Sequence, residues 1–242
     1  MKKIINSICE NYIIFCIYAL IGWIYEVSWF LIVRHKYVNR GVLFGPFLPI
    51  YGFGVLILLL MLKRFMNKKH TTENILYTSV SVFTIVTFIF TTIVEYTTPK
   101  IYNVMTYLNK YGLYLILLNL LSIIIVNILV KKFNLKIDIS VILTFLLIWI
   151  ITTLIEFVAH YVIDVYFDKL LWDYSKDFLN INKRVNWDAS RNFAIGGTVL
   201  LYTIQPLINK ILNKLNEKNK MIISLILGVP MLIDFILNVI IK

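Results

Sequence analysis

Charged side chains are scarce in this sequence. They make up 15% of 242 residues, while hydrophobic side chains make up 60%, and the mean hydropathy is +0.81. This balance excludes an ordinary water-soluble globular protein. No polar stretch exceeds about 30 residues, and because an independent domain typically needs about 50 or more, a second folded soluble domain is excluded as well.

Chemical signatures are scarce too. The phosphate-binding pattern Gly-x4-Gly-Lys-Ser/Thr is missing, so the chain has no nucleotide-hydrolysing module of its own. Neither Ser-x-x-Lys nor Gly-x-Ser-x-Gly occurs, and there is no His-rich metal motif. The two cysteines, Cys9 and Cys16, lie in the first apolar segment, where helix packing explains them better than a disulfide or a metal pair.

The chain has long apolar segments instead. Each is long enough to cross about 30 Å of hydrocarbon as a helix. The sequence therefore predicts an all-α fold, a polytopic transmembrane helical bundle of about seven spans that forms a single integral membrane domain over residues 1–242. The expected spans are 12–33, 43–62, 75–97, 111–130, 139–163, 192–209 and 221–241, with a polar interfacial loop at 164–191.

The second span has an unusual first half, which is rich in glycine and proline. Gly45, Pro46, Pro49, Gly52 and Gly54 crowd this half, and only its end is a plain apolar helix. We expect this span to enter the membrane as irregular backbone, which a bilayer tolerates only where protein or a water-filled cavity covers it.

Basic residues outnumber acidic ones, 24 to 13. They lie in short clusters beside the spans and not on one face, a pattern that favours anionic membrane lipid over nucleic acid as a partner. Their number is nearly even on the two sides, but on one side many lie among the aspartates of the loop 164–191. This asymmetry predicts a cytoplasmic N-terminus.

Four acids lie inside predicted spans. Glu26, Glu95, Glu156 and Asp234 all belong to odd-numbered spans, in the half nearer the same face of the membrane. Charges at that depth need partners or a polar interior, so their grouping predicts a polar cavity open to one leaflet. For Glu95 and Asp234, near span ends, a structural role is the favoured interpretation.

The fifth span carries a polar stripe. Glu156, His160 and Asp164 recur every four residues and therefore share one side of a helix. Such a stripe can ligate a divalent metal. The favoured alternative is a lone histidine near the interface that hydrogen-bonds to Glu156, because no second His or Cys cluster completes a metal site.

Two blocks of sequence carry a resemblance to a known family. The first block is Gly22-Trp23 with Glu26, Asn39-Arg40-Gly41, Gly45-Pro46 and Pro49-Ile50-Tyr51-Gly52, and the second is Glu156, Asp164, Trp172-Asp173-Tyr174-Ser175, Asn180, Arg184 and Gln205-Pro206. In these blocks the chain resembles the ABC-transporter type IV, or CmpB-like, family, whose members are labelled as ABC transporter permeases. The resemblance implies a transport-related subunit of the bacterial inner membrane that works with a separate ATPase subunit.

The sequence departs from the family pattern in its second block. Phe178 stands where proline is typical, Lys183 where glycine is typical, and Phe193-Ala194 where Trp-Gly is typical. These departures affect the conformation of the loop around them. Residues 66–137 resemble an additional helical hairpin relative to short members of the family.

The polar residues of the two blocks are the candidate ligand-binding cluster. Its members are Glu26, Asn39, Arg40, Tyr51, Glu156, His160, Asp164, Trp172, Asp173, Tyr174, Asn180 and Arg184. A structural plug at one end of the bundle would use the same residues, with Arg40, Arg184 and Arg191 pairing with the nearby acids.

Three functions remain open at this point. The first is a permease-like transporter subunit with a polar ligand site near one leaflet. The second is an intramembrane enzyme that acts on a lipid or lipid-linked head group with a carboxylate as general acid or base. The third is a non-catalytic membrane adaptor.

Overall fold

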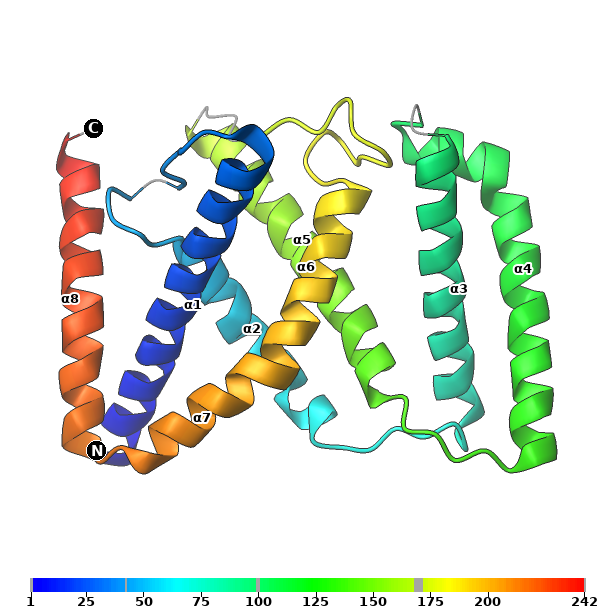
Figure 1. The fold of residues 1–242 in the computed structure, drawn as a ribbon, viewed down its shortest axis with the longest axis horizontal. Helices are drawn as coiled ribbons and strands as arrows, with labels where there is room; N and C mark the ends of the chain where they lie inside the picture. Colours follow the sequence, from blue (N-terminus) through cyan, green and yellow to red (C-terminus); the bar gives the residue numbers. More distant parts are fainter. Residues whose placement is uncertain (1, 42, 99–100, 168–171, 242) are drawn as a thin grey trace. The chain divides into compact units, whose positions relative to one another are not determined.

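The computed structural model describes residues 2–41, 43–98, 101–167 and 172–241, and over this part of the chain it is helical without strands. The all-α prediction is confirmed (Figure 1). The helices are α1 (Lys2–Arg34), α2 (Pro49–Met66), α3 (Ile75–Thr97), α4 (Val104–Phe133), α5 (Ser140–Phe167), α6 (Trp187–Val199), α7 (Gln205–Lys214) and α8 (Glu217–Ile241), with a π-helical segment η1 (Leu200–Ile204).

Six of the described helices are long and apolar enough to cross a membrane. The spanning stretches are Ile4–Arg34, Pro49–Met66, Ile75–Thr97, Val104–Phe133, Ser140–Val162 and Glu217–Asn238. Together they make the chain a multi-pass membrane protein. The irregular start of the second span is confirmed as well, because residues 43–48 are not helical and α2 begins at Pro49.

The seventh expected span, 192–209, lies within a helical run that is interrupted. Helical backbone continues from Trp187 to Lys214, but η1 separates α6 from α7. Pro206 explains the interruption, because proline has no amide hydrogen and its ring collides with the carbonyl four residues earlier, at Tyr202 within η1.

The chain folds into two compact units. The first combines Met1–Met61 with Leu200–Lys242, and the second is Leu62–Val199. The expectation of a single membrane domain stays a prediction.

The first unit is built around α1, which packs along α8 (Figure 1). Phe15, Cys16 and Ala19 of α1 form a buried core with Leu43 and Met231, so Cys16 is a packing residue as expected. The Tyr12 hydroxyl donates to the carbonyl oxygen of Gly228 at 3.1 Å, and Lys220 Nζ pairs with Glu10 Oε1 at 2.6 Å. These contacts join the first and last helices of the chain.

The second unit contains the hairpin of α3 and α4, together with α5 and α6 (Figure 1). Asparagines on α4 hydrogen-bond across the hairpin: Asn119 Nδ2 donates to Thr87 Oγ1 at 3.3 Å, and Asn127 Nδ2 donates to Ser79 Oγ at 3.0 Å. Polar bonds of this kind join helices in lipid, where hydrophobic burial contributes little to their association.

The predicted polar loop 164–191 is shorter in the structure than in the prediction. Helix α5 extends through Phe167, and α6 begins at Trp187, so the described loop covers residues 172–186. Residues 168–171 of the predicted loop lie outside the described part of the chain.

Candidate functional site

The predicted site residues form two groups, one in each unit. In the first unit, Glu26 of α1 accepts hydrogen bonds on both carboxylate oxygens. Arg40 Nε donates to Oε2 at 2.9 Å, and the Tyr51 hydroxyl donates to Oε1 at 3.0 Å. Both oxygens of this intramembrane acid are therefore satisfied, one of them by a cation.

Asn39 holds the loop that carries Arg40. Its Oδ1 accepts from Trp23 Nε1 at 2.7 Å, and its Nδ2 donates to the carbonyl oxygen of Phe44 at 3.1 Å. The Arg40 guanidinium also lies 4.4 Å from the centre of the Phe30 ring, within cation–π range. We call Trp23, Glu26, Asn39, Arg40 and Tyr51 the Glu26 cluster.

Gly22 makes the position of Tyr51 possible. A Cβ atom added at Gly22 would lie 2.3 Å from Cγ and 2.7 Å from Cβ of Tyr51. The tyrosine ring therefore packs directly on the backbone of α1, one turn before Glu26, which explains why a glycine precedes the acid by four residues.

Asp234 of α8 binds the irregular segment before α2. Its two carboxylate oxygens accept from the backbone amides of Phe44 and Gly45 at 2.9 and 2.6 Å. This contact gives Asp234 the structural role favoured from the sequence. Glu95 has a structural contact too, since Arg191 NH1 donates to its Oε2 at 2.6 Å.

In the second unit, the polar stripe of α5 meets the loop 172–186. The Tyr174 hydroxyl donates to Glu156 Oε1 at 3.1 Å, His160 Nε2 lies 2.8 Å from the carbonyl oxygen of Trp172, and Arg184 NH2 donates to Asp164 Oδ2 at 2.6 Å. We call this group the Glu156 cluster, and its members are Glu156, His160, Asp164, Trp172, Tyr174 and Arg184.

The loop keeps these side chains in place by closing on itself. Trp172 Nε1 donates to the carbonyl oxygen of Arg184 at 2.9 Å, and the amide nitrogen of Tyr174 donates to the carbonyl oxygen of Lys183 at 3.0 Å. Lys183 has a φ of +64°, a left-handed conformation that favours glycine. The loop therefore holds a lysine in a backbone conformation that a glycine would adopt without strain.

The side chains of Asp173 and Asn180 form hydrogen bonds with backbone groups and not with the polar stripe of α5. Asp173 Oδ1 accepts from the amide of Ser175 at 2.8 Å, and this backbone hydrogen bond lowers the pKa of the Asp173 carboxyl, which lies outside the spans. Asn180 Nδ2 donates to the carbonyl oxygen of Tyr102 at 2.7 Å. Both residues shape the loop, and Asn180 also joins it to Tyr102, two residues before α4 begins.

Two buried acceptor atoms of the Glu156 cluster have no hydrogen-bond partner among the described residues. They are Glu156 Oε2 and His160 Nδ1, so the hydrogen bond expected between His160 and Glu156 is not formed. His160 bonds to the carbonyl oxygen of Trp172 instead, because the loop 172–186 packs against this side of α5. Glu156 is 6% exposed and His160 is 3% exposed. A carbonyl oxygen can only accept, so the bond to Trp172 places a proton on Nε2 and leaves Nδ1 of a neutral ring as an acceptor.

A metal site is not assembled in the part of the chain that the structure describes. No group of three or more His, Cys, Asp or Glu side chains there is placed to hold an ion. Glu156, His160 and Asp164 share one stripe, but each contacts a different loop residue.

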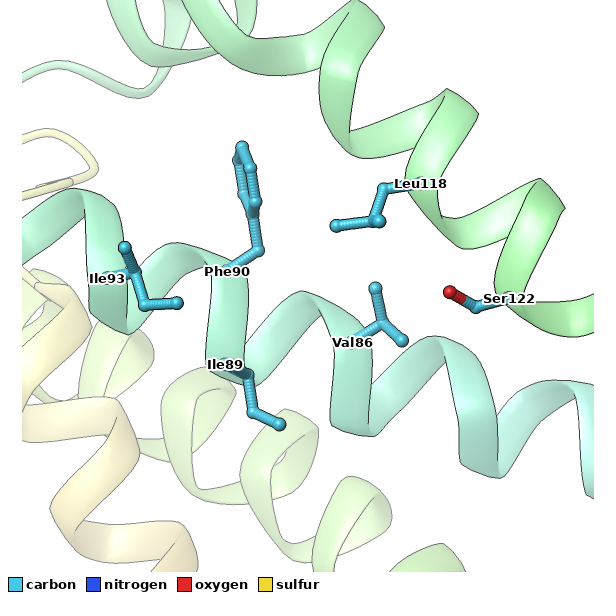
Figure 2. A pocket seen from close by; sticks show the side chains of 6 residues that line it. All are labelled: Val86, Ile89, Phe90, Ile93, Leu118 and Ser122. Carbon is cyan, nitrogen blue, oxygen red and sulfur yellow. The ribbon is translucent and has the colours of Figure 1, made fainter.

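The outer surface of the α3–α4 hairpin has an apolar hollow of about 160 Å³. Figure 2 shows that its side chains come from both helices and that Ser122 is the polar one among those labelled. Nothing in this lining recognises a charged or strongly polar ligand, so the hollow is separate from the candidate polar site.

The fold and these clusters define a multi-pass α-helical membrane protein with polar groups fixed inside each unit. The sequence model of the family described as "Putative ABC-transporter type IV" matches residues 13–110 and 104–239. The chain belongs to this family, as the resemblance in the two blocks predicted, and is a transporter-like membrane protein. Comparisons with curated proteins and with solved structures found no match.

The two matched ranges include both clusters. The Glu26 cluster lies within residues 13–110, and the Glu156 cluster lies within 104–239. The prediction that all these residues share one cavity concerns the relation between the two units, and it stays a prediction.

Proposed function

We propose that the chain is the permease-like subunit of a transporter and that the Glu156 cluster is its polar ligand site near one leaflet. The observation that carries the proposal is the partnerless oxygen of Glu156, which is buried inside an apolar span. Glu156 lies six residues before the end of that span at Val162, or about 9 Å along the helix. That depth is within reach of one membrane surface.

A carboxylate at this depth costs several kcal/mol unless something compensates it. In the Glu156 cluster one tyrosine hydroxyl donates to this carboxylate, while Arg184 NH2 pairs with Asp164 and Arg184 Nε has no partner among the described residues. A ligand that donates hydrogen bonds or carries positive charge would supply what is missing. The free Nδ1 of His160, one turn away on the same helix, would accept a second hydrogen bond from the same ligand.

The family assignment supports an energy source outside this chain. An ABC-type transporter hydrolyses ATP, whereas this sequence has no phosphate-binding loop. We therefore expect a separate ATPase subunit as a partner. Affinity purification of the tagged full-length chain from its native membrane tests this: an ATPase subunit should be recovered in stoichiometric amount, and its absence would contradict the ABC-type role.

The ligand site is tested in mild detergent with a primary alkylammonium ion as probe. The probe should raise the melting temperature of the wild-type protein in a saturable manner, and Glu156→Gln should abolish the shift because the amide no longer attracts a cation. Glu26→Gln is the matched control and should keep the shift, because Glu26 is already paired. An equal shift in wild type and Glu156→Gln would contradict the proposed site.

A further inference from the structure

Two loops at one end of the second unit pair with each other. The connection from α2 to α3, residues 67–74, runs beside the connection from α4 to α5, residues 134–139 (Figure 1). The amide nitrogen of Thr72 donates to the carbonyl oxygen of Ile137 at 3.1 Å, and Thr72 Oγ1 accepts from the amide nitrogen of Ile137 at 3.1 Å. The two segments are far apart in the sequence, so this pairing is a property of the fold.

His70 anchors the paired loops in the interior of the unit. Its carbonyl oxygen accepts from the amide nitrogen of Ile139 at 2.8 Å, and its amide nitrogen donates to Ser140 Oγ at 2.9 Å. His70 is buried, and its ring stacks on that of Phe65 with the ring centres 4.1 Å apart. The backbone beneath the exposed side chains of both loops is therefore held in one shape.

Exposed basic side chains gather around these loops. We call them the basic surface, and its members are Lys63, Arg64, Lys68, Lys69, Lys131, Lys132 and Lys136. The acids nearby are few and engaged, since Glu73 pairs with Lys136 at 2.7 Å and Asp138 Oδ1 accepts from the amide nitrogen of Ser140 at 2.9 Å. The other members of the basic surface form no ion pair with a residue that the structure describes, so most of its positive charge is not neutralised.

The position of the basic surface favours membrane lipid over a soluble protein as its partner. The last turns of α2 and α4 each carry two of its members, at the ends of stretches apolar enough to span a membrane, so these cations lie at head-group level. The loops between the helix ends are short and keep the other members close to that level. Phe133, Leu135 and Ile137, which are exposed beside them, suit the boundary between head groups and acyl chains.

We infer that the basic surface binds the head groups of anionic phospholipids, whose phosphate oxygens accept hydrogen bonds from its ammonium and guanidinium groups. Attraction to anionic lipid grows with every Lys or Arg held near the membrane surface, and charge-assisted hydrogen bonds to phosphate are strong. Basic residues flank other spans as well, but here the paired loops bring cations from two helix ends and two loops to one place. The inference does not depend on the proposed ligand at Glu156, because the basic surface contains no residue of the Glu156 cluster.

The experiment compares phosphatidylglycerol with phosphatidylcholine of the same acyl chains. Both carry a phosphate, but the choline cation offsets its charge in the second lipid. Native mass spectrometry of the delipidated full-length protein measures the affinity of each, and we expect phosphatidylglycerol to bind about 10-fold more tightly. Equal affinity for the two lipids would overturn the inference and leave the surface to an acidic protein partner.

Two variants locate the effect at exposed positions, where substitution leaves the fold intact. One removes charge from the end of α2 and the first loop, by Lys63→Gln, Arg64→Gln and Lys68→Gln together. The other removes charge from the end of α4, by Lys131→Gln and Lys132→Gln together. Each variant should reduce the preference for phosphatidylglycerol to about 2-fold without changing the affinity for phosphatidylcholine. A preference that stays at the wild-type value in either variant would overturn the shared surface.

The matched control removes as many charges as the first variant, near the start of α4 and in the loop 172–186, by Lys110→Gln, Lys176→Gln and Lys183→Gln together. These lysines are exposed as well, but Asp173 and Asp177 lie in the same loop as two of them and repel an anionic head group. The control should therefore keep the full preference. An equal loss in the control and in the first variant would show that net charge alone attracts the lipid, and it would overturn the assignment to the basic surface.

Discussion

The Glu26 cluster of the first unit and the Glu156 cluster of the second contain similar side chains. They differ in the partner of the second carboxylate oxygen of the glutamate. Each glutamate lies on a membrane-spanning helix and accepts a hydrogen bond from a tyrosine hydroxyl, at 3.0 Å for Tyr51 and 3.1 Å for Tyr174. The second oxygen of Glu26 also accepts from Arg40, whereas the second oxygen of Glu156 has no partner among the described residues.

The arginine is present in both clusters, but it is used differently. In the second unit Arg184 reaches Asp164, two turns further along α5 than Glu156. Because Asp164 pairs with Arg184, the buried carboxylate of Glu156 receives no hydrogen bond from this arginine among the described contacts. A closed ion pair stabilises the fold, while an open buried acceptor provides a place for a ligand, so this difference separates a structural cluster from a candidate site.

The largest effect is expected where an acid loses its cation in a well-buried place. Arg191 and Glu95 have side chains that are 15% and 12% exposed, so Arg191→Ala should lower the free energy of unfolding by about 3 kcal/mol because an uncompensated charge remains. Steric trapping in bicelles measures this. The control is Lys136→Ala, whose pair with Glu73 is exposed and should matter little. Equal losses in the two variants would contradict the argument from burial.

A side chain added at Gly22 should displace the Tyr51 ring and so disrupt the Glu26 cluster. Gly22→Ala places a methyl group on the Tyr51 ring, and we expect a loss of about 2 kcal/mol in unfolding free energy. Gly54→Ala in α2 is the matched control, since nothing lies within 4 Å of its added Cβ, and it should be neutral or slightly stabilising. The same loss in both would show that helix flexibility, and not contact with Tyr51, decides.

The comparison itself is tested by neutralising each glutamate. Glu26→Gln should cost about 1 kcal/mol, because it removes a partly exposed ion pair. Glu156→Gln should instead raise the free energy of unfolding by about 1 to 2 kcal/mol, because it removes an uncompensated buried charge while its amide oxygen can still accept from Tyr174. The unfolding measurement of the preceding variants applies. If Glu156→Gln were the more destabilising variant, Glu156 would have a structural partner and the two clusters would be alike.

Much of this arrangement follows from local sequence. The four-residue spacing of Glu156, His160 and Asp164 predicted a shared stripe, and apolar length predicted the spans. The pairing of arginines with nearby acids was also expected. Which arginine reaches which acid depends on the path of the loops, and a pattern along one chain does not contain that path.

The unpartnered atoms were outside the reach of sequence analysis for a related reason. Trp187 follows a polar loop, which is typical of an interfacial tryptophan, but the sequence does not show that its Nε1 lacks a partner among the described residues. Burial and the lack of a partner arise from contacts among segments that are distant in the chain. They are therefore properties of the fold and not of any motif.

The smallest predicted effect concerns how each loop makes its left-handed turn beside an arginine. Gly41, after Arg40, has a φ of +91°, while Lys183, before Arg184, has a φ of +64°. A side chain in this conformation costs about 1 kcal/mol, which glycine's larger unfolded-state entropy partly offsets. Lys183→Gly should therefore raise the free energy of unfolding by about 0.5 kcal/mol, whereas Lys183→Ala, which removes the charge but keeps a Cβ, should give no gain. If both variants stabilised the protein equally, the loss of the Lys183 charge and not relief of backbone strain would be the cause. The turn at Lys183 would then be no more strained than the turn at Gly41.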